Sequence, residues 1–420
     1  MTQPSVSVVI VSRDRADLLK RCVMGVSQLL YPRFEVVVVA DRAGLDAVAS
    51  YADRIKTIAF DAPNISAARN MGILQASGEI IAFLDDDAVP EPTWLSELVK
   101  GFALKDVSAV GGYVRGRNGI SFQWKAGSID QAGDRTDYPS QQGPFVPDLP
   151  DGQTAKLEGT NMAIRRDVLL TLGGFDPAFH YYLDETDLCL RLAKARYRIA
   201  FAPKAEVHHG FAANSTRSRG RAPKSLYQLG ASKAVFLRKH ANLAKIDSIF
   251  NDYAQAQRQR LLHYLVFGVI EPRDVGLLMK SLHEGFAEGQ KRALSPHPLH
   301  AEPSEFMPFR STATGRSMVL KGRTWQRAKL RAQARELRSA GHIVTVFLLG
   351  PSFRRHHVRF EAPGIWVQSG GLWGRSDRSQ KPVLGKGFHA RVAHEVQRCS
   401  EQRAFSSQGC ADIRLKNDSN

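Results

Sequence analysis

The chain has 420 residues, 43% hydrophobic and 24% charged, which is typical of soluble globular protein and excludes a disordered or collagen-like chain. Its length exceeds that of one typical domain, so we expect one domain of about 240 residues followed by smaller parts. The formal net charge is +17, and residues 306–420 hold 21 Lys and Arg against 7 Asp and Glu. Such a basic region suits an anionic membrane surface, nucleic acid or a phosphorylated acceptor, or it is simply a solvated surface.

Strands and helices alternate in the first part of the chain. Runs rich in β-branched residues predict strands at 5–12, 34–40, 54–60 and 79–84, with a helix at 64–76. The first of these runs lacks the flanks of a signal peptide, and we interpret it as a strand. This alternation predicts an α/β fold with a doubly wound, mainly parallel sheet.

Charged side chains follow several of these predicted strands. Asp14 follows the first strand, Asp41 the second, and the run Asp85, Asp86 and Asp87 the fourth. The carboxyl ends of parallel strands form one rim of the sheet, where ligands bind. Each close pair of carboxylates at a protein surface costs on the order of several kcal/mol, so the acidic run predicts a bound cation or a proton.

The next segments carry fewer local signals. Residues 117–155 are rich in Gly, Gln, Asp and Pro with weak periodicity, which predicts a long mobile loop over the site. Residues 184–210 predict a short helix, a turn and a strand that ends at His208 and His209. Cys22, Cys189, Cys399 and Cys410 are scattered without CxxC spacing, which predicts neither a zinc site nor a disulfide framework.

The second half of the chain changes character. Residues 222–290 have a helical pattern, and prolines between residues 295 and 308 indicate a linker. A basic amphipathic helix, a cap at Gly341 and a strand then predict a small α/β module, and the last fifteen residues look disordered. The expected domains are 1–245, a helical extension and linker at 246–305, and a basic accessory module at 306–420. The apolar stretch 261–270 has about half the length of a membrane span.

An ordered series of motifs over about residues 5–240 resembles the inverting GT-A glycosyltransferases of glycosyltransferase family 2. The series is VSVVIVSRDR, FEVVVVAD, ISAARNMGI, GEIIAFLDDDAVPEPTWL, GTNMAIRRDVL, LGGFD, DETDLCLRL and PKAEVHH. The resemblance implies a GT-A fold and transfer of a sugar from a nucleotide-sugar donor to an acceptor hydroxyl. The Gln-x-x-Arg-Trp motif of processive family members is missing from the sequence, so we expect addition of a single sugar, in polysaccharide or glycolipid biosynthesis.

The resemblance also implies a divalent cation, Mn²⁺ or Mg²⁺, bound by an Asp-x-Asp motif. Asp85 and Asp87 match that motif, and Asp87 is the expected direct ligand. His209 matches the family position that completes the metal site, with His208 as the neighbouring alternative. The other interpretation is an acidic turn that is only solvated and a surface histidine without a ligand role.

A carboxylate is implied as the general base. The family shows Glu-Asp-x-Asp-Leu at the start of a helix, and Asp184-Glu185-Thr186-Asp187-Leu188 stands here. Glu185 occupies the base position; because the order is swapped, Asp184 stays a candidate, and carboxylates also cap helices without a catalytic role. Asp187 is expected to stabilise local structure.

The resemblance implies further contacts with the donor and the acceptor. Ser12, Asp14, Arg15, Asp41, Arg69 and Asp86 match nucleotide-sugar positions, and Arg165 and Arg166 match the acceptor side. The family pattern of two Asp followed by Gly-Ser is replaced by Ala40-Asp41-Arg42-Ala43. The base of the nucleotide, uracil, thymine or guanine, therefore stays open.

Two other functions compete with this interpretation. A sugar nucleotidyltransferase would show a Gly-rich basic loop after the first strand, which VSRDRADLL lacks. An inactive GT-A-like scaffold that recruits partners through its basic region is the main alternative. Residues 306–420 faintly resemble a helix-strand unit of GT-B glycosyltransferases, and their basic helix could dock on anionic lipid; nucleic acid is not an expected partner. We expect a cytoplasmic protein, with a peripheral position on the inner face of the cell membrane as an alternative.

Overall fold

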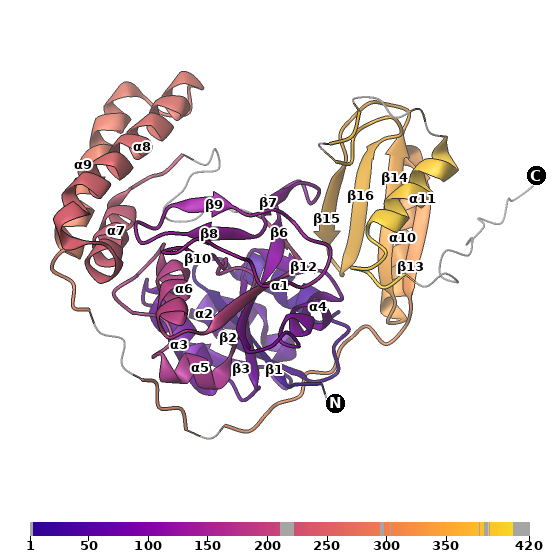
Figure 1. Cartoon of the computed structure of the whole chain (residues 1–420). Helices are drawn as coiled ribbons and strands as arrows, with labels where there is room; N and C mark the ends of the chain where they lie inside the picture. The colour runs from indigo at the N-terminus through magenta and orange to yellow at the C-terminus, as the bar shows by residue number, and fades with distance from the viewer. Residues whose placement is uncertain are drawn as a thin grey trace, which may run out of the picture.

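The computed structural model describes residues 3–210, 222–294, 298–302, 304–377, 379–381, 385 and 387–405. Figure 1 shows a central α/β domain, a group of helices on one side of it, and a smaller α/β unit on the other side. The last fifteen residues, which the sequence predicts to be disordered, lie outside the described residues.

The central domain is built on a nine-stranded sheet with the order β3-β2-β1-β4-β11-β6-β12-β5, and β7 pairs with β6. The pairs β1·β2, β1·β4, β2·β3 and β6·β12 are parallel, whereas β11 is antiparallel to both neighbours. The mainly parallel, doubly wound sheet is therefore confirmed. The strands are β1 (Val6–Ser12), β2 (Phe34–Ala40), β3 (Lys56–Ala59), β4 (Ile80–Asp85), β5 (Ala88–Pro90), β6 (Val107–Arg115), β7 (Phe122–Trp124), β11 (Met162–Arg165) and β12 (Arg198–His209).

Helices cover both faces of this sheet because alternate strand residues point to opposite faces. Val9 and Phe83 belong to one buried cluster, together with residues of α3, α5 and α6. Val8 and Leu84 belong to a second cluster, together with residues of α1 and α4. The helices are α1 (Ala16–Val26), α2 (Arg42–Ala47), α3 (Ile65–Gln75), α4 (Trp94–Gly101), α5 (Arg166–Thr171) and α6 (Asp184–Lys194).

The prediction of a long mobile loop at 117–155 is wrong in part, because the segment contains short strands. Besides β7, this segment contains β8 (Gly127–Ile129), β9 (Arg135–Asp137) and β10 (Thr154–Ala155), which form a small antiparallel sheet with the order β10-β8-β9. Strands of two or three residues are too short to show a period of two in the sequence. Arg135 of β9 also pairs with Glu158, which follows β10, at 3.1 Å.

Three helices follow the central domain: α7 (Tyr227–His240), α8 (Ile246–Val266) and α9 (Pro272–Gly289). The helical pattern predicted for 222–290 is confirmed. At Gly285 a Cβ would lie 1.9 Å from the carbonyl oxygen of Tyr227, so α7 and α9 cross in backbone contact. α7 thus packs directly on α9, and the boundary expected at residue 245 stays a prediction.

The C-terminal unit is an α/β module, as the sequence predicts. Its four-stranded sheet has the order β13-β14-β16-β15. The preceding segment runs along the central domain, where the backbone N–H of Phe309 donates to the carbonyl of Phe34 at 2.8 Å. Figure 1 shows this connection passing beneath the central domain. The elements are β13 (Ser317–Arg323), α10 (Arg327–Ser339), β14 (Ile343–Gly350), β15 (His357–Glu361), β16 (Ile365–Gly371) and α11 (Phe388–Arg398).

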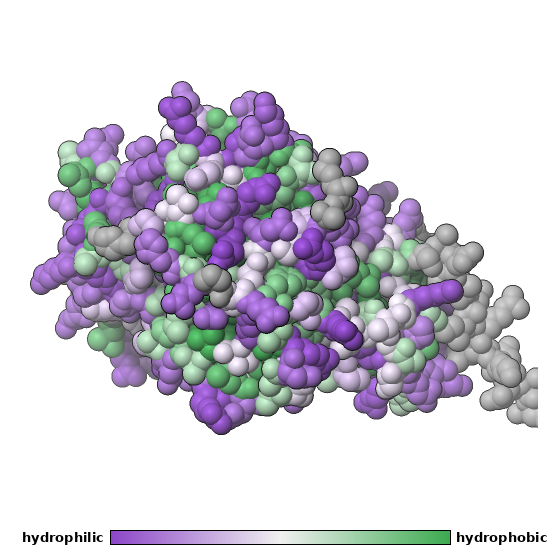
Figure 2. Space-filling view, turned by 90° about the horizontal axis from the view of Figure 1, so that it is seen from below, coloured by the Kyte–Doolittle hydropathy of each residue, from purple (hydrophilic) through white to green (hydrophobic). Residues whose placement is uncertain are grey.

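The surface gives no broad apolar face in the view of Figure 2, where hydrophobic residues are interspersed with hydrophilic ones. Within the described part of the chain, the helices lack the combination of length and hydropathy that is needed to cross a membrane.

Candidate active site

The acidic run lies at the carboxyl end of β4, beside the end of β1. Val11 pairs with Asp85, and Ser12 Oγ donates to Asp86 Oδ2 at 2.7 Å. Arg15 Nη1 lies 3.2 Å from Asp86 and 3.4 Å from Asp87. Burial raises the pKa of Asp86 to about 7, although Arg15 acts in the opposite direction. Ser12 and Arg15 thus relieve part of the repulsion that the sequence predicts.

Asp85, Asp87 and His209 form a cluster that fits a divalent cation. One ligand atom of each lies within 4.8 Å of the others. His209 Nε2 is 3.1 Å from Asp87 Oδ1 and 4.0 Å from Asp85 Oδ2. His209 Nδ1 lies 3.2 Å from Gln123 Oε1, and because that oxygen only accepts, Nδ1 carries the proton. The two carboxylates suit a hard divalent cation such as Mn²⁺ or Mg²⁺, and an imidazole nitrogen is a common ligand of transition-metal ions.

The structure separates the two neighbouring histidines. Successive residues of a strand point to opposite faces, and His208 points away from the acidic run. Its Nε2 donates to Glu91 Oε1 at 2.7 Å, and its ring centroid is 4.8 Å from that of Trp366 in the C-terminal unit. Of the two alternatives, His209 is therefore the one beside Asp85 and Asp87.

A second acidic segment stands in the first turn of α6, at Asp184 and Glu185. Arg69, buried on α3, joins it to the first: its guanidinium pairs with Asp184 and lies 3.2 Å from Asp85. Burial raises the pKa of Asp184 to about 7, although the charge of Arg69 acts to lower it. The sequence order of these residues did not predict this bridge, although Arg69 itself was among the expected site residues.

Glu185 is paired with a residue that the sequence analysis missed. Lys156 Nζ lies 2.6 Å from Glu185 Oε1 and 3.5 Å from Glu158. Burial alone would raise the pKa of Glu185, but the Lys156 ammonium, together with Asp184 and Arg69, outweighs it and lowers that pKa to about 2. Glu185 is therefore ionised at neutral pH. No motif marks Lys156 in the sequence, because its partner lies 29 residues away.

Asp187 stabilises local structure, as expected. Its carboxylate is fully buried and lies 2.7 Å from both Arg191 and Lys239 and 2.8 Å from His240. Burial acts to raise the pKa of Asp187, but the His240 hydrogen bond and the charges of Arg191 and Lys239 together outweigh it and hold that pKa well below its usual range. This network ties α6 to α7.

A cavity of about 680 Å³ opens beside the acidic run. Four of the six expected nucleotide-sugar residues line it: Ser12, Asp14, Arg15 and Asp86. Tyr181 and Lys224 also line it and were not expected from the sequence. The volume falls in the range of small-molecule sites.

Asp41 shapes the first loop of this cavity. Its Oδ1 accepts from the Gly44 N–H at 2.7 Å and caps α2, and its Oδ2 accepts from the Asp14 N–H at 2.6 Å. Asp14 has a φ of +59°, a conformation that needs such support in a residue with a side chain. A direct contact of Asp41 with a nucleotide stays a prediction.

The structure places Arg165 and Arg166, expected on the acceptor side, away from the acidic run. β11 runs antiparallel to β4, and Arg165 pairs with Ile80 at the start of β4, whereas Asp85 is at the other end of β4. There Arg165 donates to the Val107 carbonyl at 3.1 Å, and Arg166 donates to the Ala76 carbonyl at 2.7 Å. The sequence does not reveal the direction of β11, and a contact of either arginine with an acceptor stays a prediction.

Comparison with known proteins agrees with this architecture. Over 393 residues, 84% of this chain, it is 25% identical to the O-antigen biosynthesis protein RfbC of Myxococcus xanthus, of which it covers 29%. Over 229 residues, 48% of this chain, it is 29% identical to the probable glycosyltransferase YdaM of Bacillus subtilis, of which it covers 50%. A glucosyl-dolichyl phosphate glucuronosyltransferase of Haloferax volcanii is 26% identical over 228 residues, which are 49% of this chain and 68% of that protein. The chain thus spans half or less of the length of the first two relatives.

The family profile described as "Glycosyltransferase like family 2" matches residues 4–222. This match covers more than half of the chain and includes β1 to β12 with both acidic segments. The protein belongs to glycosyltransferase family 2, and its central domain is the part of the chain that carries the family's sequence.

Proposed function

We propose that the central domain transfers a single sugar from a nucleotide-sugar donor to an acceptor hydroxyl, with inversion and with a divalent cation. The observation that carries this proposal is the meeting of two acidic segments and His209 beside a cavity of about 680 Å³. The missing Gln-x-x-Arg-Trp motif supports transfer of one sugar at a time.

The chemistry assigns a role to each segment. Asp85, Asp87 and His209 would hold the cation, which supplies charge neutralisation for the departing nucleoside diphosphate. Ser12, Asp14, Arg15 and Asp86 lie along the cavity where the donor would bind. Glu185, ionised at neutral pH, would accept the proton of the acceptor hydroxyl. The oxygen of that hydroxyl would at the same time bond to the anomeric carbon of the donor sugar, and the bond from that carbon to the diphosphate would break.

Arg69 completes this arrangement by linking the two halves. Its guanidinium contacts Asp184, next to the proposed base, and Asp85, in the proposed metal site. A rigid planar group that contacts two carboxylates fixes their separation. Asp184 is the second candidate for the base, but its side chain is 4% exposed against 17% for Glu185, so Glu185 is the more accessible of the two.

For the acceptor, we infer a glycan or lipid-linked glycan under assembly. Two of the relatives support this class by their names, one for O-antigen biosynthesis and one for a dolichyl phosphate substrate. A peripheral position on an anionic membrane would suit such an acceptor. The exposed Arg327, Lys329 and Arg335 of α10 support it, whereas Arg331 is engaged with Glu361 at 2.7 Å. Sedimentation of the chain with anionic against neutral vesicles tests this part.

The test of the function is release of nucleoside diphosphate from UDP-, dTDP- and GDP-sugars with Mn²⁺, Mg²⁺ or EDTA. We expect one donor to be cleaved slowly in the presence of metal only. Asp87→Ala should abolish release, whereas Asp46→Ala, which removes an exposed carboxylate paired with Arg42, should not. Absence of both release and metal-dependent nucleotide binding in the unaltered protein would favour the inactive scaffold.

A further inference from the structure

The strands next to Asp87 and His209, β5 and β12, contact the C-terminal unit. Asp87 directly precedes β5, and His209 ends β12. The two strands pair antiparallel, with His209 opposite Ala88 and His208 opposite Val89. β5 has three residues and lies at the edge of the sheet. So short an edge strand has few backbone hydrogen bonds, even with those of the Gly210 N–H to the Asp87 carbonyl and of the Glu91 N–H to the Glu206 carbonyl at its two ends, so side-chain contacts also contribute to its position.

A buried ion pair supplies one such contact. Arg403, from the last described turn of the chain, donates to both carboxylate oxygens of Glu91, from Nε at 2.9 Å and from Nη2 at 3.0 Å. His208 donates to the same carboxylate at 2.7 Å. The side chains of Arg403 and Glu91 are 2% and 3% exposed. Glu91 therefore ties the end of β5 to β12 and to the C-terminal unit at once.

Apolar contacts reinforce this attachment. Val89 of β5 belongs to a buried cluster with Val358, Phe360 and Trp366 of the C-terminal unit. The Arg403 guanidinium lies 4.4 Å from the centre of the Trp366 ring, and the ring of His208 lies 4.8 Å from it. Trp366 thus packs against both polar partners of Glu91 and keeps water away from the ion pair, which strengthens it.

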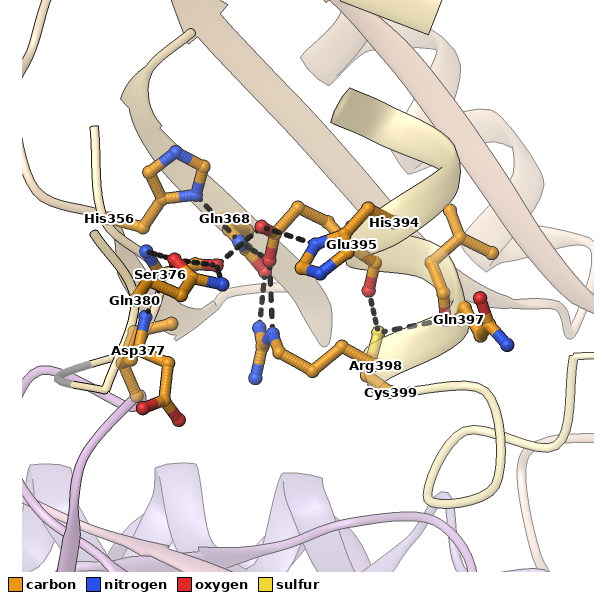
Figure 3. Close-up of polar contacts among 12 residues, drawn as sticks. His356, Gln368, Ser376, Asp377, Gln380, His394, Glu395, Gln397, Arg398 and Cys399 are labelled. Carbon is orange, nitrogen blue, oxygen red and sulfur yellow. Dashed lines mark hydrogen bonds and ion pairs between the residues drawn. The ribbon is translucent and has the colours of Figure 1, made fainter. Parts of the chain in front are cut away.

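The turn that carries Arg403 is itself fixed to the C-terminal sheet. Figure 3 shows Glu395 of α11 surrounded by Gln368, Ser376 and Arg398. Gln368 Nε2 donates to Glu395 at 2.8 Å, Ser376 Oγ at 2.5 Å and Arg398 Nε at 3.0 Å, and Glu395 is fully buried. Immediately after α11, the Arg403 N–H donates to the Cys399 carbonyl at 3.1 Å. Arg403 is therefore presented by a rigid frame.

We propose that Arg403 is a positioning residue for the proposed metal site. Through Glu91 and His208 it holds β5 and β12 in the arrangement that brings Asp87 and His209 within 3.1 Å of each other. The C-terminal unit is then a part of the catalytic apparatus, although none of its described residues lies in the cluster of Asp85, Asp87 and His209. The inference rests on the metal-dependent function proposed above.

The experiment measures Mn²⁺ binding to the full chain by electron paramagnetic resonance, and the Mn²⁺ dependence of nucleoside diphosphate release, together with the thermal midpoint Tm. Arg403→Met removes the charge and keeps the length of the side chain. The double variant Glu91→Gln with Arg403→Met also removes the buried carboxylate that would otherwise be left without its cation. Lys204→Met is the matched control, because Lys204 pairs with Glu401 across the same interface, at 2.8 Å, but is 41% exposed.

We expect Arg403→Met to weaken Mn²⁺ binding by about 10- to 100-fold, as loss of groups that orient metal ligands does, and to lower the Tm. The double variant should regain Tm but keep the weak Mn²⁺ binding, which a purely structural role would not produce. Lys204→Met should stay within about twofold of the unaltered protein. Normal Mn²⁺ affinity in both Arg403 variants would overturn this inference alone. Failure of the unaltered protein to bind Mn²⁺ would overturn the proposed metal site, and this inference with it.

Discussion

Lys156 Nζ lies 2.6 Å from Glu185 Oε1, so the carboxylate proposed as general base is paired with a buried ammonium group. The pair lowers the pKa of Glu185 to about 2, whereas burial raises that of the adjacent Asp184 to about 7. The two candidate bases therefore predict different pH dependences. A lowered pKa also means that the pair stabilises the fold fully above the unfolded pKa of 4.5, and that this contribution is lost as the pH falls towards 2.

The first prediction concerns the pH profile of donor cleavage. With Glu185 as base, titration of the base should not lower kcat/KM between pH 8 and about pH 5, because Glu185 stays ionised over this range. Lys156→Met removes the cation that favours the ionised form, so the pKa of Glu185 should rise and an acid limb should appear at higher pH. Lys100→Met, at an exposed pair with Glu97, is the control. An acid limb near pH 7 that is the same with and without Lys156 would assign the base to Asp184.

The second prediction concerns the base itself. Glu185→Gln keeps the shape of the side chain and removes its ability to accept the proton, so kcat for transfer should fall by about 10²- to 10⁴-fold. Nucleotide binding should be nearly unchanged, because Glu185 is not among the residues that line the 680 Å³ cavity. Steady-state transfer and equilibrium nucleotide titration measure the two quantities. Equal loss of both would mean that Glu185 acts in donor binding.

The third prediction separates a structural carboxylate from the catalytic ones. Asp187→Asn leaves Arg191, Lys239 and His240 around a neutral group, and should lower the free energy of unfolding by about 3–5 kcal/mol. Urea unfolding followed by tryptophan fluorescence measures it. Asp17→Asn, at an exposed residue of α1, should change this quantity by less than about 0.5 kcal/mol. A stable Asp187→Asn protein with lost activity would contradict the structural role.

The fourth prediction concerns the loop after β1. Asp41→Ala removes the cap of α2 and the acceptor of the Asp14 N–H. Loss of a cap costs about 1 kcal/mol, and the freed Asp14 should abandon its positive φ. We expect a modest fall in Tm together with an increase in the nucleotide dissociation constant, measured by calorimetry. Asp41→Asn should keep the cap, so weaker nucleotide binding at unchanged Tm would identify the contact with the Asp14 loop as the one that matters.

Local patterns carried the sequence-based predictions that are confirmed. Strands at 34–40 and the helix at 64–76 appear as β2 and α3, shifted by no more than one residue at each end. The first contains a continuous run of β-branched residues, and the second is a longer helical segment that begins after the capping residue Asn64. The short strands β8, β9 and β10 were missed because two or three residues hold no periodic signal.

The sequence by itself determined the acidic run at the end of β4, the acidic start of α6 and the family to which the chain belongs, because both acidic segments and each motif of the family series depend on residues close together in the chain. Only the tertiary structure decided that Arg69 contacts both Asp85 and Asp184, and that Lys156 pairs with Glu185. It also placed Arg165 beside the start of β4, at the opposite end of that strand from Asp85. The physical reason is that strand order and direction set which distant side chains meet, and the periodicity of a single chain does not encode them.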